Sequence, residues 1–155
     1  MLFWIFDLDN TLYQLKDNYS FNYNFIKKDY HLRYLLEKLP CKKDIFTNAN
    51  HSHTNNTLKL LGLEYIFGKI YSRDNIRALK PDILAFTTLI KLNNIKSSDK
   101  VVFFEDTIEN LITAKSFGWI TVLISKKKVL LDEIDFWFPN INMALEYFNN
   151  HIENR

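Results

Sequence analysis

The sequence predicts an α/β fold, a three-layer α/β/α sandwich in which helices cover both faces of a parallel sheet. Short apolar runs alternate along the chain with segments of helical period, the pattern expected when buried strands are joined by crossover helices. The chain has 155 residues, of which 47% are hydrophobic, and this is enough for one core and too little for two. We therefore expect residues 1–155 to form a single domain.

Six short runs have the length and composition of strands. Five read as buried strands and the sixth as an edge strand: Leu2–Phe6, Asp44–Thr47, Lys69–Tyr71, Val101–Phe104, Ile120–Ile124 and Phe136–Phe138. Five stretches between and after them have helical period: His31–Leu39, Thr54–Leu61, Asp82–Leu92, Ile108–Phe117 and Asn142–Phe148.

Glycine and proline mark several of these helix ends. Gly62 and Gly118 suit the left-handed position that follows a helix, and Pro81 suits a first helical turn. The alternation of elements predicts a doubly wound sheet. In that architecture ligands bind beyond the carboxyl ends of the strands.

Composition narrows the class of protein. Twenty Lys and Arg residues against 18 Asp and Glu residues give a net charge of +2, which makes nucleic acid an unlikely partner. The opening apolar run, residues 1–6, is too short for a signal segment or a membrane span. A single cysteine, Cys41, cannot form an internal disulfide, so we expect a reducing, cytoplasmic setting. The four histidines have no zinc-ligand spacing with Cys41.

Polar side chains end several of the predicted strands. Asp7 and Asp9 follow the first strand two residues apart, a spacing that points both carboxylates the same way in extended chain. An ordinary strand-ending turn would also place aspartates there. The other strand ends favour a site, because Thr47-Asn48 closes the second strand and Glu105-Asp106 closes the fourth.

Lys80 stands just before Pro81, the proline that opens the third predicted helix, and it adds a cation at the same edge of the sheet. Carboxylates, a hydroxyl and a lysine at one edge are the groups that phosphoryl transfer needs. They supply a nucleophile, an acid/base, ligands for a hard metal ion and a positive clamp.

Four segments together resemble the motifs of the haloacid dehalogenase (HAD) superfamily phosphatases. Phe6-Asp7-Leu8-Asp9-Asn10-Thr11 is similar to the DxDxT signature, Ile45-Phe46-Thr47-Asn48-Ala49 to the second motif, Lys80-Pro81 to the third, and Phe104-Glu105-Asp106-Thr107 with Asn110 to the fourth. The segments around residues 32–49 and 53–64 resemble the pyrimidine 5′-nucleotidase-like branch more closely. The resemblance implies a Rossmann-like, HAD-type fold.

The resemblance also implies a role for each matching residue. Asp7 would be the nucleophile that forms an aspartyl-phosphate, and Asp9 the general acid and base. Mg²⁺ would be held by Asp7, the backbone carbonyl of Asp9, and Asp106, with Glu105 contributing directly or through water. The Thr47 hydroxyl, the Asn48 backbone N–H and Lys80 would bind the phosphate, and Thr47 and Lys80 would also assist catalysis.

The resemblance is incomplete at the cap domain. Members of that branch carry a helical cap after the first motif, whereas here only residues 13–30 separate the motif from the resumed similarity. We therefore expect a capless or minimal-cap protein. Within this segment Phe21, Tyr23 and Phe25 alternate with asparagines, a pattern that favours an edge strand with one buried aromatic face. A lid remnant and a homodimer contact through residues 21–25 are the alternatives.

Two further features have a plain structural explanation. Lys126–Lys128 is better explained as a solvated charge run than as a contact for a polyanionic substrate. His53 follows the second motif closely enough to approach the phosphate site, although a residue at the start of a helix is the simpler interpretation.

The sequence thus predicts a Mg²⁺-dependent phosphomonoester hydrolase, a phosphatase that acts on a small phosphorylated substrate. The branch resemblance favours a nucleoside 5′-monophosphate. A phosphatase for a phosphoprotein or nucleic-acid end is one alternative, because an uncovered site would admit it. A non-catalytic binding module that retains the fold is another, although such a module has no physical need for adjacent carboxylates.

Overall fold

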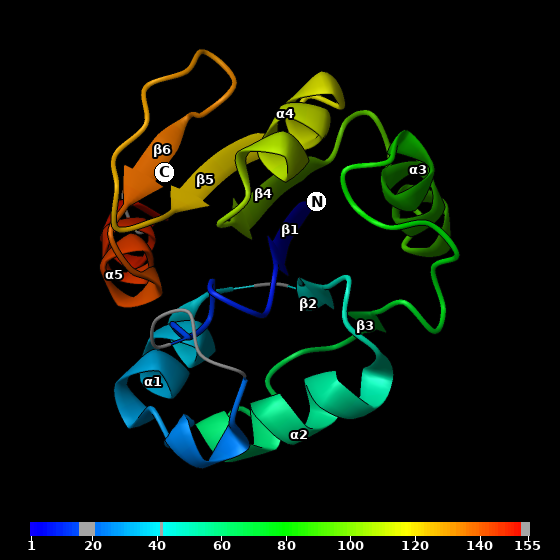
Figure 1. The fold of residues 1–155 in the computed structure, drawn as a ribbon. Coiled ribbons are helices and arrows are strands. Elements are labelled where there is room, and N and C mark those ends of the chain that lie inside the picture. The colour runs from blue at the N-terminus through cyan, green and yellow to red at the C-terminus, as the bar shows by residue number, and fades with distance from the viewer. Residues whose placement is uncertain (16–20, 41, 153–155) are drawn as a thin grey trace.

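Six parallel strands form one sheet in the order β3-β2-β1-β4-β5-β6 (Figure 1). The computed structural model describes residues 1–15, 21–40 and 42–152. The strands are β1 (Leu2–Phe6), β2 (Lys42–Phe46), β3 (Ile70–Tyr71), β4 (Lys100–Glu105), β5 (Ile120–Ile124) and β6 (Phe136–Phe138). The α-helices are α1 (Tyr30–Lys38), α2 (His51–Leu61), α3 (Ile83–Leu92), α4 (Ile108–Ser116) and α5 (Ile141–Ile152).

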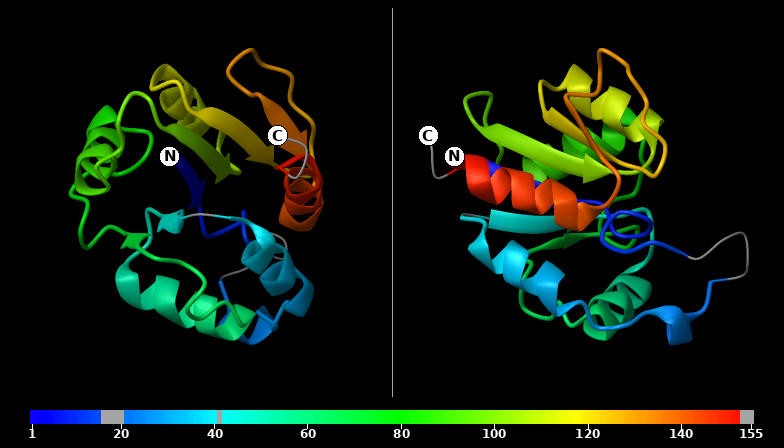
Figure 2. Two further views of the ribbon diagram at one scale, coloured as in Figure 1. Left: turned by 180° about the vertical axis from the view of Figure 1, so that it is seen from behind. Right: turned by 90° about the vertical axis from the view of Figure 1, so that its left-hand side faces the viewer.

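Helices cover both faces of the sheet, which confirms the predicted three-layer α/β/α sandwich with a parallel, Rossmann-like sheet (Figures 1 and 2). Alternate residues of β1 point to opposite faces, as strand geometry requires. Trp4 and Phe6 pack in the core under α1, α2 and α5, whereas Phe3 and Ile5 pack in the core under α3 and α4. All four side chains are buried, so β1 is the centre of both cores.

The register of the central strands brings their carboxyl ends to one level. Phe6 pairs with Ile45 of β2 and with Phe104 of β4. The rings of Phe6 and Phe104 stack with centroids 4.6 Å apart. Asp7 continues the ladder, because its N–H donates to the Phe104 carbonyl at 2.9 Å. The residue that follows β1 is therefore held at the carboxyl edge.

The six strands and five helices predicted along the chain are present, and their ends shift by a few residues. The largest differences are in α2, which begins three residues earlier than predicted, and in α5, which continues to Ile152. The earlier start of α2 follows from its cap, because the Asn50 side chain accepts the His53 N–H at 2.8 Å. Gly62 and Gly118 adopt the predicted left-handed conformation, with φ of 75° and 78°. Asp82 caps α3, so Pro81 lies just before that helix.

The predicted edge strand at residues 21–25 is wrong. Tyr23–Phe25 forms a short 3₁₀ helix, η1, and Phe25 is 64% exposed. Asn22 explains the difference, since its side chain accepts the Asn24 N–H at 2.9 Å and closes a turn that competes with extended chain. Part of the segment 13–30, residues 16–20, and also Cys41 lie outside the described residues.

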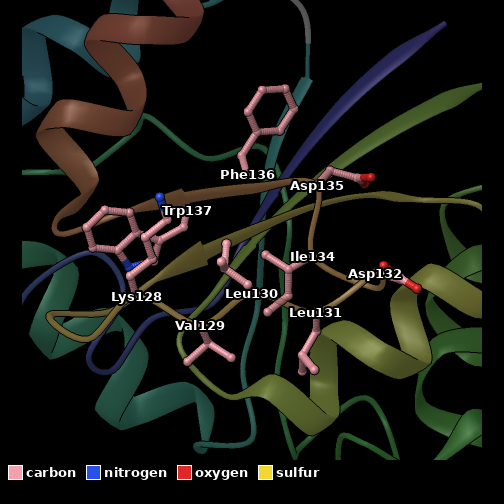
Figure 3. Close-up of a pocket in the computed structure, with 9 residues that line it drawn as sticks. All are labelled: Lys128, Val129, Leu130, Leu131, Asp132, Ile134, Asp135, Phe136 and Trp137. Atoms are coloured by element: carbon pink, nitrogen blue, oxygen red, sulfur yellow. The ribbon is translucent and has the colours of Figure 1, made fainter.

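Lys126–Lys128 is exposed, as expected for a solvated charge run. It opens the loop between β5 and β6, which surrounds a pocket of about 510 Å³ (Figure 3). Lys128, Trp137 and seven further residues of this loop and β6 line the pocket, and none of the described lining residues is a predicted site residue.

Among the described helices, none combines the length and the apolar composition that a membrane span requires.

Candidate active site

The predicted site residues meet at the carboxyl edge of the sheet. Asp7 follows β1, Thr47 follows β2, and Glu105 ends β4. Lys80 reaches the same place from the loop that joins β3 to α3. All four residues are buried, and none is more than 7% exposed. Parallel strands produce this convergence, because neighbouring strands end on the same edge.

Lys80 is the central hydrogen-bond donor of the site. Its Nζ donates to Asp7 Oδ1 at 3.0 Å, to Glu105 Oε2 at 2.7 Å and to the Phe46 carbonyl at 2.7 Å. These three contacts use all three protons of the ammonium group. Lys80 therefore joins β1, β2 and β4 at the site.

The charges around Lys80 determine its protonation. Burial alone would lower the pKa of Lys80, but the carboxylates of Asp7 and Glu105 outweigh that effect and raise it. Burial raises the pKa of Glu105 well above its usual value, and the negative charge of Asp7 adds to the effect while Lys80 opposes it. Lys80 is therefore a fixed positive charge in the site.

Backbone contacts hold Glu105 and Lys80 in place. Glu105 Oε1 accepts the N–H groups of Asp106 at 3.0 Å and Thr107 at 3.2 Å. The Asn48 side chain clamps the Lys80 backbone, donating to its carbonyl at 3.0 Å and accepting its N–H at 2.8 Å. Asn48 thus fixes Lys80 through its amide. The contact of its backbone N–H with phosphate stays a prediction.

Thr11 connects two of the acids. Its Oγ1 donates to Asp7 Oδ2 at 2.9 Å, and it also lies 3.4 Å from Asp106 Oδ1. Thr11 is completely buried in the turn after β1. One hydroxyl proton shared in this way orients the Asp7 carboxylate and keeps Asp106 beside it.

Asp7, Glu105 and Asp106 form a group that suits a divalent cation. Each offers a carboxylate oxygen, and these oxygens all lie within 4.8 Å of one another. Three carboxylates and the ammonium of Lys80 leave two uncompensated negative charges when all are ionised, which one divalent cation would balance. Carboxylate oxygens are the ligands that Mg²⁺ prefers. The residues therefore fit the ion that the sequence implies.

Glu105 and Asn110 differ in what they offer a metal ion. Glu105 is 1% exposed and already accepts three hydrogen bonds. Asn110 lies on the first turn of α4, and its buried Oδ1 has no hydrogen-bond partner among the described residues. Glu105 is better placed to hold Lys80 than to bind an ion directly.

The ionisation of Asp106 adds to the excess of negative charge in this group of carboxylates, and its effect on stability can be measured. Burial, with a smaller contribution from Asp7, raises its pKa from 3.8 to about 6. The folded state therefore holds the proton more tightly than the unfolded state, and the metal-free protein loses stability as the pH rises from about 4 to about 6. Asp106→Asn removes this loss. We expect a higher Tm for the variant in EDTA at pH 7 to 8 and equal values near pH 4, measured by thermal unfolding. A lower Tm for the variant at pH 7 would contradict the account.

The Asp9 carboxylate has a separate set of partners. The Tyr13 hydroxyl donates to Asp9 Oδ1, and His53 Nε2 lies 2.9 Å from the same oxygen and 3.2 Å from Oδ2. Burial raises the pKa of Tyr13, and the hydrogen bond to Asp9 raises it further, so Tyr13 remains a neutral donor. The side chain of Asp9 is 32% exposed, which leaves it open to solvent beside the buried group.

The sequence interpretation missed two of these contacts. His53 is indeed in the first turn of a helix, as expected, yet its ring also contacts Asp9. Tyr13 lies four residues after Asp9, and the two residues form an isolated bridge. The i,i+4 spacing of Asp9 and Tyr13 was the only local signal, whereas the His53 contact spans 44 residues.

Thr47 is buried next to the site, with 4% of its surface exposed. Its Oγ1 accepts the Ala49 N–H at 3.0 Å, and its backbone N–H pairs with the Tyr71 carbonyl of β3. These contacts fix the hydroxyl at the end of β2. Its contact with phosphate stays a prediction.

A family model described as haloacid dehalogenase-like hydrolase matches residues 18–124, more than half of the chain. The chain belongs to this family. The matched region includes Thr47, Lys80, Glu105 and Asp106 and begins after Asp7 and Asp9. The residues of this HAD-family chain that resemble the second, third and fourth motifs therefore lie inside the matched region.

Solved structures share the fold of this HAD-family protein. An L-2-haloacid dehalogenase from Xanthobacter autotrophicus is 15% identical with a TM-score of 0.64, and the match covers 81% of this chain and 62% of that one. The HAD-hydrolase YfnB from Bacillus subtilis, solved with bound magnesium, is 17% identical with a TM-score of 0.62, over 78% of this chain and 56% of that one.

A predicted phosphoglycolate phosphatase from Haemophilus somnus is 17% identical with a TM-score of 0.61, over 76% of this chain and 56% of that one. The HAD-family chain therefore spans about six tenths of the length of these structures. The similarity establishes the fold, and the neighbours include both dehalogenases and phosphatases.

Proposed function

We propose that this HAD-family hydrolase is a Mg²⁺-dependent phosphomonoester hydrolase that uses Asp7 as its nucleophile. The observation that carries the proposal is the arrangement of Asp7 between the Lys80 ammonium and the Thr11 hydroxyl, in a group of three carboxylates. Lys80 and Thr11 orient the nucleophile, and the surplus of negative charge calls for a divalent cation.

Asp9 favours phosphate ester hydrolysis over dehalogenation. A halide leaves as a stable anion and needs no proton, whereas an alkoxide leaving group needs a general acid. Asp9 lies two residues after Asp7, is partly exposed, and carries the donors Tyr13 and His53. A phosphatase can use such a second carboxylate to protonate the leaving oxygen, whereas a dehalogenase has no leaving group that needs a proton.

The reaction has two displacements at phosphorus. An Asp7 carboxylate oxygen attacks phosphorus, the bond to the ester oxygen breaks, and protonated Asp9 gives its proton to that oxygen. Asp9, now ionised, takes a proton from water, whose oxygen attacks the aspartyl-phosphate and releases phosphate and the Asp7 carboxylate. The positive charge of Lys80 would balance the charge on the phosphate, and the Thr47 hydroxyl would donate a hydrogen bond to it.

Asp7 and Asp106, with the backbone carbonyl of Asp9, would hold the Mg²⁺ ion. When bound, the ion would shield the nucleophile and the phosphate from each other's negative charge. Glu105 would act mainly through Lys80, which it contacts at 2.7 Å. The bound magnesium of the Bacillus subtilis neighbour and the group of acids in this chain both support this assignment.

The substrate class proposed first is the nucleoside 5′-monophosphate, and it rests on the resemblance to the pyrimidine 5′-nucleotidase-like branch. The described residues between Asp9 and α1 contain only the short helix η1, which supports a minimal cap. Few groups would then contact the leaving group. We expect less than about 10-fold discrimination between nucleotides and sugar phosphates, since specificity requires contacts made in the transition state.

A substrate screen tests the proposal. The protein would be assayed with p-nitrophenyl phosphate, nucleoside 5′-monophosphates, sugar phosphates, a phosphopeptide and 2-chloropropionate, each with Mg²⁺ and with EDTA. We expect phosphate release from the small esters only with Mg²⁺. Chloride release, or phosphate release that is equal in EDTA, would contradict the proposal. A hundredfold preference for one nucleotide by a monomer would contradict the minimal-cap argument alone.

A further inference from the structure

Two side chains, Tyr23 and His53, connect the segment 21–25 to Asp9. Tyr23 of η1 has its hydroxyl 2.8 Å from His53 Nδ1, and His53 Nε2 lies 2.9 Å from Asp9 Oδ1. The Tyr13 hydroxyl donates to the same Asp9 oxygen. The segment after the first motif therefore reaches Asp9 through a histidine of α2.

The hydrogen bonds of this connection select one arrangement of the imidazole. An ionised carboxylate can only accept, so His53 Nε2 must carry a proton when Asp9 is ionised. In a neutral ring, Nδ1 is then an acceptor, and the Tyr23 hydroxyl can donate to it. Tyr23 thus favours the tautomer that donates to Asp9.

Packing holds the His53 ring in this orientation. The Phe21 ring lies edge-on to it with centroids 4.8 Å apart, and the Tyr23 ring is tilted against it at 5.7 Å. The His53 backbone N–H is bonded to the Asn50 side chain at the start of α2. The His53 side chain is only 20% exposed, so the ring has little freedom to turn away from Asp9.

We propose that His53 is a positioning residue that orients the Asp9 carboxylate, and that Tyr23 and Phe21 hold His53 in place. The role given to Asp9 rests on the proposed function. Residues 21–25, which lie between the first motif and α1, then support the catalytic carboxylate. Tyr13 and His53 fix Asp9 from two sides, so Asp9 faces the leaving oxygen in one conformation.

Loss of this support should affect the chemical step more than substrate binding. His53 contacts Asp9, and among the described residues it has no hydrogen bond or ion pair with Asp7, Lys80 or Asp106. For His53→Ala we expect kcat to fall on the order of 10- to 100-fold, because a misplaced Asp9 is a poorer general base for the water that hydrolyses the aspartyl-phosphate, a step common to every substrate. We expect KM for p-nitrophenyl phosphate to change less than about twofold.

Matched variants separate positioning from a structural role. His53→Gln keeps one donor and one acceptor, and it should recover most of the lost kcat. Tyr23→Phe should lower kcat by a smaller factor than His53→Ala. His51→Ala, which changes an exposed histidine in the same turn of α2, is the control and should leave kcat unchanged. In an Asp9→Asn background, His53→Ala should have no further effect on kcat.

An NMR measurement tests the contact without relying on activity. The ¹⁵N signals of the His53 ring should show a protonated Nε2 and an acceptor Nδ1 in the wild type, and should change in Tyr23→Phe and in Asp9→Asn. Identical ring signals in all three proteins would overturn the proposal. An equal loss of kcat from His53→Ala in the wild-type and Asp9→Asn backgrounds would also overturn it. If the wild type hydrolyses no phosphomonoester, the proposed function fails, and the ring signals alone decide whether Tyr23 and His53 hold Asp9.

Discussion

Asp7→Asn should lower the turnover of p-nitrophenyl phosphate by about 10⁴-fold or more, the scale seen when an enzyme loses its nucleophile. The asparagine has the size of the aspartate and can still meet Thr11 and Lys80, so the fold should survive. The measurement is the steady-state rate with Mg²⁺, together with the Tm of each protein.

Asp132→Asn is the matched control for Asp7→Asn. It makes the same chemical change at an exposed carboxylate on the loop between β5 and β6, in the lining of a pocket that contains no predicted site residue. Its turnover should equal that of the wild type. Turnover by Asp7→Asn within tenfold of the wild type would exclude Asp7 as the nucleophile.

Lys80→Met should reduce the free energy of unfolding by about 3–5 kcal/mol, the usual cost of removing one partner of a buried ion pair. Asp7 and Glu105 would both lose their cation, and Glu105 is 1% exposed. The Phe46 and Phe103 rings, whose centroids lie 4.9 Å and 5.4 Å from Nζ, would also lose their contact with the cation. Urea unfolding at pH 7 measures the change.

Lys115→Met is the control for this comparison. Lys115 pairs with Asp135 at 2.7 Å, but its side chain is 36% exposed, so water screens the pair. Its replacement should cost less than about 1 kcal/mol. Equal losses of unfolding free energy for Lys80→Met and Lys115→Met would show that the contacts of Lys80 with Asp7, Glu105 and the Phe46 carbonyl stabilise the fold no more than an exposed ion pair does.

The strands and helices could be predicted because their signals are local. The buried runs around Phe6 and Phe104 are bounded by polar residues, and Gly62 ends a helix with a conformation that few other residues adopt. The carboxyl ends of parallel strands lie at the same edge of the sheet, and this general property predicted which site residues lie together. Asp7, Thr47, Glu105 and Lys80 could be placed together without any knowledge of the side-chain contacts.

The remaining features depend on contacts between distant parts of the chain. The alternation at residues 21–25 predicted a strand, but the Asn22 side chain closes a turn there, and Tyr23 contacts His53, 30 residues away. The contact of the Asn48 backbone N–H with phosphate stays a prediction from the motif, but no motif indicated that the Asn48 side-chain amide holds the Lys80 backbone 32 residues away. Neither contact leaves a periodic signal, so pattern reasoning could not find them.

The most direct test of the central claim is to trap the enzyme during turnover. The protein would be mixed with p-nitrophenyl phosphate and Mg²⁺, quenched in acid within the first turnover, and digested for mass spectrometry. The account predicts one phosphoryl group on Asp7, absent when EDTA replaces Mg²⁺. Rapid turnover with the phosphoryl group on another residue, or with none on the protein at any quench time, would contradict it.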